Sequence, residues 1–393
     1  MAITVIHIID LVLWGIMAVS VVYVLLFALA SLLPDRKRPV SKEGNDNKKR
    51  TFLVLFPAYK EDAVIVDSVS AFLRQDYPSD LFHVAVISDH MQSKTNELLE
   101  AMPITLLTPS FVKSSKARAL QFAIEQTKAF KADYVVILDA DNTVQPDFLT
   151  LLNLECTLGH KAIQCHRTAK NLNNDIAVLD GLSEEINNSI FRQGHNRIGL
   201  SSALIGSGMC FNYDWFSSHV TLLDSAVEDR ELEAFLMKER IHVHYAKHIY
   251  VQDEKVSSHD NFQRQRLRWM TGQVQTLVHM MPYVPRAIVT GNVNYLDKTL
   301  QQALIPRSIL LVLIPFFGVV TLIAARAWTL KWWILMAALC VALIAAIPHS
   351  MRTSTILGKA RKLPRMAWHM LRNLFRINPR NKEFLHTTHG KNN

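Results

Sequence analysis

An uncharged apolar run near the start of the sequence, Leu11 to Leu33, limits what this chain can fold into. A helix needs about 20 apolar residues to cross a lipid bilayer, and this run is long enough. A cleaved signal peptide is the alternative, but no Lys or Arg precedes the run and its apolar core is too long. We therefore predict a transmembrane anchor over residues 1–33.

Two more apolar runs lie near the carboxyl end, Ser308 to Ala325 and Trp332 to Pro348. The short link between them carries Trp328 and two basic residues, a composition typical of the membrane–water interface. This pattern predicts a transmembrane helical hairpin over residues 303–350. A re-entrant or buried core hairpin is the alternative.

Basic residues follow the first apolar run closely, and the tail is also rich in Lys and Arg from Arg352 onward. The positive-inside rule places such residues in the cytoplasm. We therefore expect an integral protein of the cytoplasmic (inner) membrane, in contact with lipid, with its amino terminus outside. Its cytoplasmic parts would include a basic linker over residues 34–50 and an amphipathic helix and tail over residues 351–393.

The composition fits one polar catalytic domain combined with a few membrane spans. Hydrophobic residues make up 49% of the chain, too many for an ordinary soluble protein, and charged residues 20%, too many for a protein buried in lipid. The four cysteines form no C-x-x-C pair and are read as buried thiols. The net charge of +9 lies mainly beside the spans, so we expect no nucleic-acid partner.

Three uninterrupted apolar segments in the polar part read as buried strands: 52–56, 84–87 and 134–138. Segments with helical spacing separate them, the second being Lys116 to Phe130. Strands that are apolar throughout are typical of a parallel sheet covered on both faces. We predict an α/β domain over residues 51–272 with a mostly parallel sheet and helices on both faces, followed by interfacial helices over residues 273–302.

Polar residues stand where each of these strands ends: Tyr59, Asp89 and Asp139. In open α/β sheets ligands bind beyond the carboxyl ends of the strands, so these side chains are expected to converge. The chain has no glycine-rich phosphate-binding loop of the P-loop or dinucleotide type. A bound phosphate would therefore need carboxylates and a metal ion.

Asp139-Ala140-Asp141 supplies such carboxylates directly after a predicted strand. In an extended segment residues i and i+2 point the same way, so both side chains could face one site. Two hard oxygen ligands suit Mg²⁺ or Mn²⁺, which would neutralise charge on a diphosphate leaving group. A solvated turn is the ordinary alternative for a D-x-D sequence.

Two further groups carry chemistry. Glu228-Asp229 opens a helical pattern, where carboxylates either complement the helix dipole or accept a proton from an attacking hydroxyl. Gln265-x-x-Arg268-Trp269 combines an amide, a fixed cation and an aromatic ring. Arginine makes paired hydrogen bonds to pyrophosphate, and a tryptophan face suits a sugar ring. A basic helix lying on acidic lipid is the alternative.

Taken together, these groups resemble the family 2 glycosyltransferases, in particular the membrane branch with cellulose, chitin and hyaluronan synthases and ceramide glucosyltransferase. The resemblance covers roughly residues 50–275. The matching segments follow the family's order: Phe56-Pro57-Ala58-Tyr59-Lys60-Glu61, Ser88-Asp89, Lys116-Ala117-Arg118-Ala119-Leu120, Asp139-Ala140-Asp141, Gly206-Ser207-Gly208-Met209, Glu228-Asp229 and Gln265-x-x-Arg268-Trp269.

The resemblance implies a glycosyltransferase A-type fold, a Mg²⁺ or Mn²⁺ cofactor and an inverting transfer from a nucleotide-sugar, usually a uridine one. It implies that Asp139 and Asp141 bind the metal and that Asp229, beside Glu228, is the general base. The nucleotide-sugar would contact Pro57, Tyr59, Glu61, Asp89, Lys116, Asp139 and Arg268. The acceptor would contact Ser207, Gly208, Gln265 and Trp269.

The acceptor is expected to be a polysaccharide or another glycan, in the synthesis of cell-surface polysaccharide. Polymer-secreting relatives usually have six or more spans, whereas three are predicted here. Transfer to a lipid or lipid-linked acceptor is therefore an alternative, as is an oligomer or an export partner that completes a channel. A catalytically silent scaffold subunit is a further alternative, which the intact motifs disfavour.

Two weaker patterns remain. The tail segment containing Phe384, Thr387 and His389 is similar to the gating loop of cellulose synthase, although an ordinary chain terminus is the alternative. His242, His244 and His248 suggest a zinc site. Strand alternation near residue 243 explains the first two more simply, so we assign no zinc to them.

Overall fold

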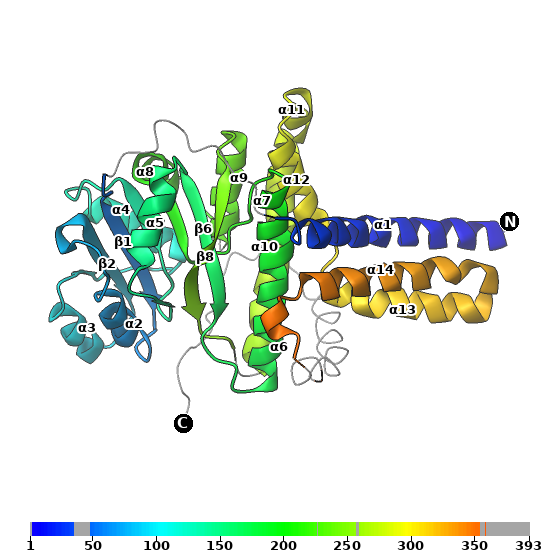
Figure 1. Ribbon diagram of the computed structural model, residues 1–393, viewed down its shortest axis with the longest axis horizontal. Helices are drawn as coiled ribbons and strands as arrows, with labels where there is room; N and C mark the ends of the chain where they lie inside the picture. The colour runs from blue at the N-terminus through cyan, green and yellow to red at the C-terminus, as the bar shows by residue number, and fades with distance from the viewer. Residues whose placement is uncertain (1, 35–47, 226, 257–258, 354–357, 359–393) are drawn as a thin grey trace.

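The computed structural model describes residues 2–34, 48–225, 227–256, 259–353 and 358. Three layers follow one another along the long axis in Figure 1: a sheet with its covering helices, a group of transverse helices, and three long apolar helices. Most of the predicted linker (residues 34–50), most of the predicted tail helix and the segment around Phe384, Thr387 and His389 lie outside the described residues.

The described strands form one eight-stranded sheet of order β3-β2-β1-β4-β7-β6-β8-β5. Strands β1 to β4 run parallel to one another, as does the pair β6 and β8, but β7 is antiparallel to both its neighbours and β5 is an antiparallel edge. The sheet is therefore mixed, and its parallel pairs outnumber its antiparallel ones, in keeping with the predicted mostly parallel sheet. The bounds are β1 Phe52–Tyr59, β2 Phe82–Asp89, β3 Thr105–Leu107, β4 Tyr134–Ile137, β5 Thr143–Val144, β6 Ala162–Ala169, β7 Met209–Asn212 and β8 Val243–Asp253.

Helices cover both faces of this sheet, as predicted. Alternate residues of β1 point to opposite faces, so Leu53 and Leu55 join one core while Val54 and Phe56 join the other. The first core is completed by α4, α8 and α9, and the second by α2, α3 and α5. Their bounds are α2 Ile65–Phe72, α3 Ser93–Glu100, α4 Lys116–Gln126, α5 Phe148–Thr157, α8 Tyr213–Val220 and α9 Glu228–Lys238.

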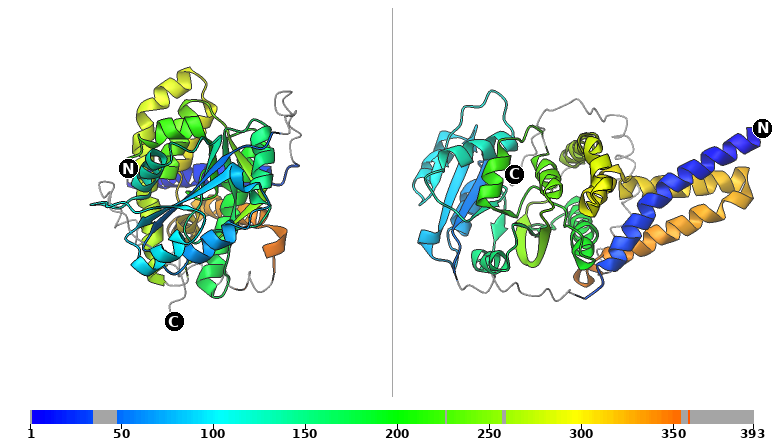
Figure 2. Two further views of the ribbon diagram at one scale, coloured as in Figure 1. Left: turned by 90° about the vertical axis from the view of Figure 1, so that its left-hand side faces the viewer. Right: turned by 90° about the horizontal axis from the view of Figure 1, so that it is seen from above.

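Among the described residues, three helices are long and apolar enough to cross a membrane, as predicted: α1 (Ala2–Ala30), α13 (Arg307–Ala324) and α14 (Leu330–Ala346). They project from the rest of the molecule as one bundle in Figure 1 and in the right-hand view of Figure 2. The helix α1 begins well before Leu11 and so includes Asp10. Asp10 pairs with Lys331 and accepts a hydrogen bond from Trp332 Nε1 at 2.9 Å, which joins α1 to α14.

The transverse layer lies between the sheet and these spans (Figure 1). It consists of α6 Asp175–Asn187, the π-helical segment η3 Asn188–Gly194, α7 His195–Arg197, α10 His259–Met280, α11 Val284–Val289 and α12 Val293–Ala303. The helix α10 continues through the predicted domain boundary at residues 272 and 273. The signature residues of the catalytic domain and the first predicted interfacial residues therefore share one helix.

The anchor helix α1 docks onto the transverse layer through aromatic and polar contacts. The rings of Phe27 and His195 stack with centroids 3.6 Å apart. Tyr23 donates a hydrogen bond to Asp297 Oδ1 at 2.8 Å, and its hydroxyl lies 2.9 Å from His195 Nε2. Gly194 is in direct contact with the backbone of Phe27, where a Cβ atom would collide with the carbonyl oxygen. The anchor is thus part of the folded unit.

Candidate active site

A cavity of about 520 Å³ lies beyond the carboxyl ends of β1, β2 and β4, between the sheet and the transverse layer. Its wall brings together residues that are far apart in the sequence but that the motif analysis singled out. Those lining it are Pro57, Tyr59, Glu61, Asp89, Lys116, Asp139, Asp141, Glu228, Asp229, Gln265, Arg268 and Trp269. Phe384, Thr387 and His389, which are outside the described residues, cannot be placed relative to it.

Lys116 is the hub of the polar contacts on this wall. It is the first residue of α4, whose start is capped by Ser115. Its ammonium group donates hydrogen bonds to Asp139 Oδ1 and to the carbonyl oxygen of Gly206 at 2.5 Å, and lies 3.5 Å from Glu228 Oε1. Burial lowers the pKa of Lys116, but Asp139 and Glu228 outweigh it, so the net shift is upward and the charge is retained.

Asp139 and Asp141 stand on a turn, which corrects the expectation of an extended segment. The backbone N–H of Asn142 donates to the carbonyl oxygen of Asp139 at 3.0 Å. The half-buried Asp139 carboxylate faces Lys116, whereas the buried Asp141 carboxylate accepts the Glu254 N–H at 2.7 Å. Because both side chains still line one cavity, their oxygens are suitable ligands for Mg²⁺ or Mn²⁺.

Glu228 and Asp229 begin α9 and are adjacent on the cavity wall. Burial, opposed by Lys116 and reinforced by Asp229, raises the pKa of Glu228 to about 7. The nearby Gly206 has a left-handed φ of +81°, and a Cβ there would lie 3.6 Å from Asp229 Oδ2. A glycine at this position avoids backbone strain and leaves the Asp229 carboxylate open toward the cavity.

The helix α10 presents Gln265, Arg268 and Trp269 to the same cavity. Burial lowers the pKa of Arg268, and the carboxylates Glu228 and Asp139 oppose this shift, so its guanidinium stays a cation among acidic groups. The guanidinium carbon of Arg266 lies 4.4 Å from the ring centroid of Trp269 and stacks on it. This stacking and the pair of Arg266 with Asp180 fix the tryptophan against α6.

Asp89, at the end of β2, is buried, and its Oδ1 lies 2.5 Å from His90 Nδ1. Ser207 and Gly208, by contrast, lie behind the cavity wall. The Ser207 hydroxyl donates to Asn142 Oδ1, and a Cβ on Gly208 would lie 3.0 Å from Val251. Their placement argues against direct contact with an acceptor, because this loop reaches the cavity through Gly206.

A buried network of ion pairs on the cavity wall was not found from the sequence. Arg167 Nη2 lies 3.0 Å from Glu184 Oε2, Arg192 Nη1 lies 3.1 Å from Glu184 Oε1, and Lys255 Nζ lies 2.7 Å from Asp253 Oδ1. These cations, despite burial, lower the pKa of Glu184. Asp253 ends a strand as Asp89 and Asp139 do, and that signal could have revealed it; Arg192 and Glu184 carry no such signal.

Comparison with known proteins shows similarity to a known sequence and to solved structures. A stretch of 106 residues, 25% of this chain, is 30% identical to glucomannan 4-beta-mannosyltransferase 7 of Arabidopsis thaliana, and it spans only 19% of that enzyme. The solved structure of the mannosyltransferase PcManGT from Pyrobaculum calidifontis, in complex with GDP-Man and Mn²⁺, superposes with a TM-score of 0.50 at 16% identity, covering 81% of this chain and 92% of that one.

The superposition with the Pyrobaculum enzyme extends over the α/β domain and shows a shared glycosyltransferase A-type fold. A family model described as glycosyltransferase like family 2 matches residues 49–272, which is more than half of the chain. That range contains every residue named above on the walls formed by the sheet and by α9 and α10. The chain therefore belongs to glycosyltransferase family 2 and is a glycosyltransferase.

Proposed function

We propose that the protein transfers a hexose from a nucleotide-sugar, with inversion, to a glycan acceptor at the cytoplasmic face of the membrane. The observation that carries this proposal is the convergence of Asp139, Asp141, Asp229 and Arg268 on one cavity. Such a site holds metal-binding carboxylates, a candidate base and a cation for a diphosphate. The mannosyl relatives, one of them a glucomannan enzyme, support a polysaccharide product and a hexosyl donor.

The residues on the wall divide the chemistry between donor and acceptor. Asp139 and Asp141 would hold Mg²⁺ or Mn²⁺, which when bound supplies positive charge to the diphosphate. Arg268 and Lys116 provide fixed cations for the same leaving group. Asp229 accepts the proton of the acceptor hydroxyl. At the same time the hydroxyl oxygen of the acceptor bonds to the anomeric carbon, and the bond from that carbon to the diphosphate breaks. Attack from the face opposite the leaving group inverts the anomeric centre.

A lipid or lipid-linked acceptor is a second candidate, because the cavity also reaches the membrane spans. Its wall includes Val24 of α1, Leu311 of α13 and Leu343 of α14, which are apolar residues suited to a lipid chain. The basic residues Arg266 and Arg307 lie on the same wall. Their guanidinium groups suit an anionic headgroup such as a phosphate.

The test is a screen of radiolabelled nucleotide-sugars with membranes that contain the protein. We expect transfer from one UDP-sugar, only with Mg²⁺ or Mn²⁺, with the label in insoluble polymer; GDP-mannose is the comparison donor. Label in the lipid extract would support the second candidate. Asp229→Asn and Asp139→Ala should each lower the rate at least a hundredfold, on the scale of lost general-base or charge stabilisation.

Full activity of either variant would overturn the mechanism. Lack of transfer from every donor, in protein that still binds nucleotide, would favour a silent scaffold subunit. A matched control is Asp133→Asn. Asp133 accepts hydrogen bonds from Thr51 at the opposite ends of the strands and does not line the cavity, so its rate should be unchanged.

A further inference from the structure

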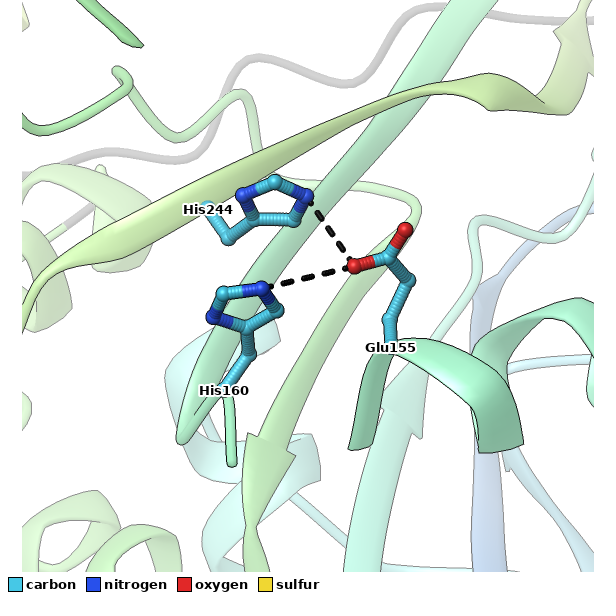
Figure 3. A group of neighbouring side chains, drawn as sticks. All are labelled: Glu155, His160 and His244. Atoms are coloured by element: carbon cyan, nitrogen blue, oxygen red, sulfur yellow. Dashed lines mark ion pairs between the residues drawn. The ribbon is translucent and has the colours of Figure 1, made fainter. Parts of the chain in front are cut away.

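Glu155, His160 and His244 form a cluster that the sequence analysis did not see, because they come from three separate segments. Glu155 lies near the end of α5, His160 on the following loop and His244 near the start of β8. In Figure 3 both imidazole rings point a nitrogen toward the same carboxylate. The three ligand atoms all lie within 4.8 Å of one another. Of the histidines considered for zinc earlier, this cluster contains His244.

The spacing of the ligand atoms matches a metal coordination shell. His244 Nε2 lies 3.1 Å and His160 Nε2 3.5 Å from Glu155 Oε2. Two ligands that are each about 2.0–2.1 Å from a tetrahedral zinc ion are about 3.4 Å apart. The two rings are nearly parallel, with centroids 4.0 Å apart and planes at 6°. Because a metal ion lies in the plane of each imidazole that binds it, at least one of the two rings must rotate when an ion binds.

The Glu155 carboxylate at the centre of the cluster is buried and needs a compensating cation. The Glu155 side chain is only 9% exposed, and its carboxylate faces the imidazole rings of His160, His244 and His248. A buried carboxylate is unfavourable unless a cation compensates its charge. A metal ion held by the same imidazoles would supply that charge.

A bulge in β8 adds a fourth donor. The register with β6 shifts between Cys165, opposite Ala246, and His166, opposite Tyr250, so three residues of β8 are extra. The extra segment includes His248, whose Nε2 lies 3.6 Å from Glu155 Oε1. In a regular strand residues 244 and 248 would be about 13 Å apart. The bulge thus brings both histidines to one carboxylate.

This cluster is distinct from the candidate active site. It sits where β6 and β8 begin, with Ile163 opposite His244, whereas the carboxyl ends of these strands, Ala169 opposite Asp253, approach the cavity. The six residue steps from Ile163 to Ala169 along β6 correspond to about 20 Å. None of the three ligand residues lines the cavity.

We propose that Glu155, His160 and His244, with His248 as a fourth ligand, bind a first-row transition-metal ion, with Zn²⁺ as the expected one. Imidazole and carboxylate are ligands that Zn²⁺ accepts, whereas the all-carboxylate pair in the active site suits Mg²⁺ or Mn²⁺. The ion would tie the loop after α5 to the bulge of β8. The proposed role is structural, and it does not depend on the proposed sugar transfer.

The test uses full-length protein in detergent, without a histidine tag and stripped of metal with a chelator. Zn²⁺ is titrated against a chromophoric chelator in excess Mg²⁺, which occupies the active-site carboxylates. We expect one tight Zn²⁺ per chain, a higher Tm on binding, and an X-ray absorption spectrum with nitrogen and oxygen ligands at about 2.0–2.1 Å. His244→Ala and His160→Ala should each weaken Zn²⁺ binding at least tenfold.

His219→Ala is the matched control. The His219 ring also pairs with a carboxylate, Glu239 at 2.7 Å, and stacks on Trp215, but it belongs to no three-ligand group in the described chain. Zn²⁺ binding should be unchanged in it. Glu155→Gln keeps the side-chain shape and serves if a histidine variant does not fold. Equal Zn²⁺ binding by wild type and ligand variants, or proton binding alone with no Zn²⁺, would overturn the proposal.

Discussion

The contact between Glu228 and Lys116 shows how single residues set the charge of the candidate site. Glu228 is buried beside Asp229, yet Lys116 is 3.5 Å away and is shared with Asp139. A pKa of about 7 for Glu228 means that near neutral pH the group changes between its neutral and charged forms. The charge around Asp229 therefore depends on pH in the physiological range.

The raised pKa of Glu228 determines the direction in which the stability of the protein changes with pH. The pKa of Glu228 rises from 4.5 to about 7 on folding, so the folded chain binds the proton more tightly. The associated stability is fully present below pH 4.5 and is lost as pH rises through 7. Gln cannot ionise. We therefore expect the free energy of unfolding of Glu228→Gln to exceed that of wild type above pH 7 by on the order of 2 kcal/mol. Thermal unfolding between pH 5 and 8 measures this, and a pH-independent difference would contradict it.

Most of the motif residues at the site could be predicted from the sequence because they stand near a strand end or at a helix start, whereas Gln265, Arg268 and Trp269 lie within α10. Lys116, Asp139 and Glu228 are of the first kind, and the cavity brings them together. The arginine and glutamate pairs on α6 and η3 could not be predicted, because their partners are set by how α6 packs against the sheet. Glu155 and His160 could not be predicted either, because tertiary packing brings them to His244.

At the scale of elements, uninterrupted apolar runs predicted β1, β2 and β4 well, and helical spacing predicted α4. The antiparallel β7 was missed because Met209–Asn212 is only four residues long and carries no turn signal that shows its direction. The turn at Asp139 was missed because D-x-D alone does not distinguish a turn from an extended segment. The turn is set by the backbone hydrogen bond from Asn142 N–H to the Asp139 carbonyl oxygen, and Asp139 N–H also donates to the Ser207 hydroxyl.

The docking of α1 on η3 yields a prediction at this scale. Gly194→Ala places a Cβ against the Phe27 carbonyl oxygen, so α1 must move and the stacking of Phe27 on His195 is disturbed. We expect a loss of about 1–3 kcal/mol, typical of overpacking, together with reduced activity. Thermal unfolding in detergent and the transfer assay measure both.

The control for that experiment is Gly15→Ala in α1, the helix that Gly194 contacts. No heavy atom lies within 4 Å of a Cβ at Gly15, so its unfolding free energy should stay within about 0.5 kcal/mol of wild type. If the two alanine variants behaved alike, close backbone contact at Gly194 would not be what holds α1 in place.

For the whole molecule, the pairing of Asp10 with Lys331 and Trp332 links helices α1 and α14, which are far apart in the sequence. Asp10→Asn leaves the Lys331 cation without its counter-charge in a largely buried position. We expect this single change to lower the free energy of unfolding by about 1–2 kcal/mol, less than for a fully buried pair. The double variant Asp10→Asn with Lys331→Met should recover part of that loss. Unfolding of the single and double variants measures the coupling, and purely additive effects would rule it out.

The apolar helices α1, α13 and α14 all reach the wall of the candidate active site, for example through Val24, Leu311 and Leu343. Helices in a bilayer tilt to match its hydrocarbon thickness. We therefore expect a change in tilt to alter the shape of this cavity. The acyl-chain length of the surrounding lipid would then be a determinant of the transfer rate, and the membrane would act on the enzyme as an effector.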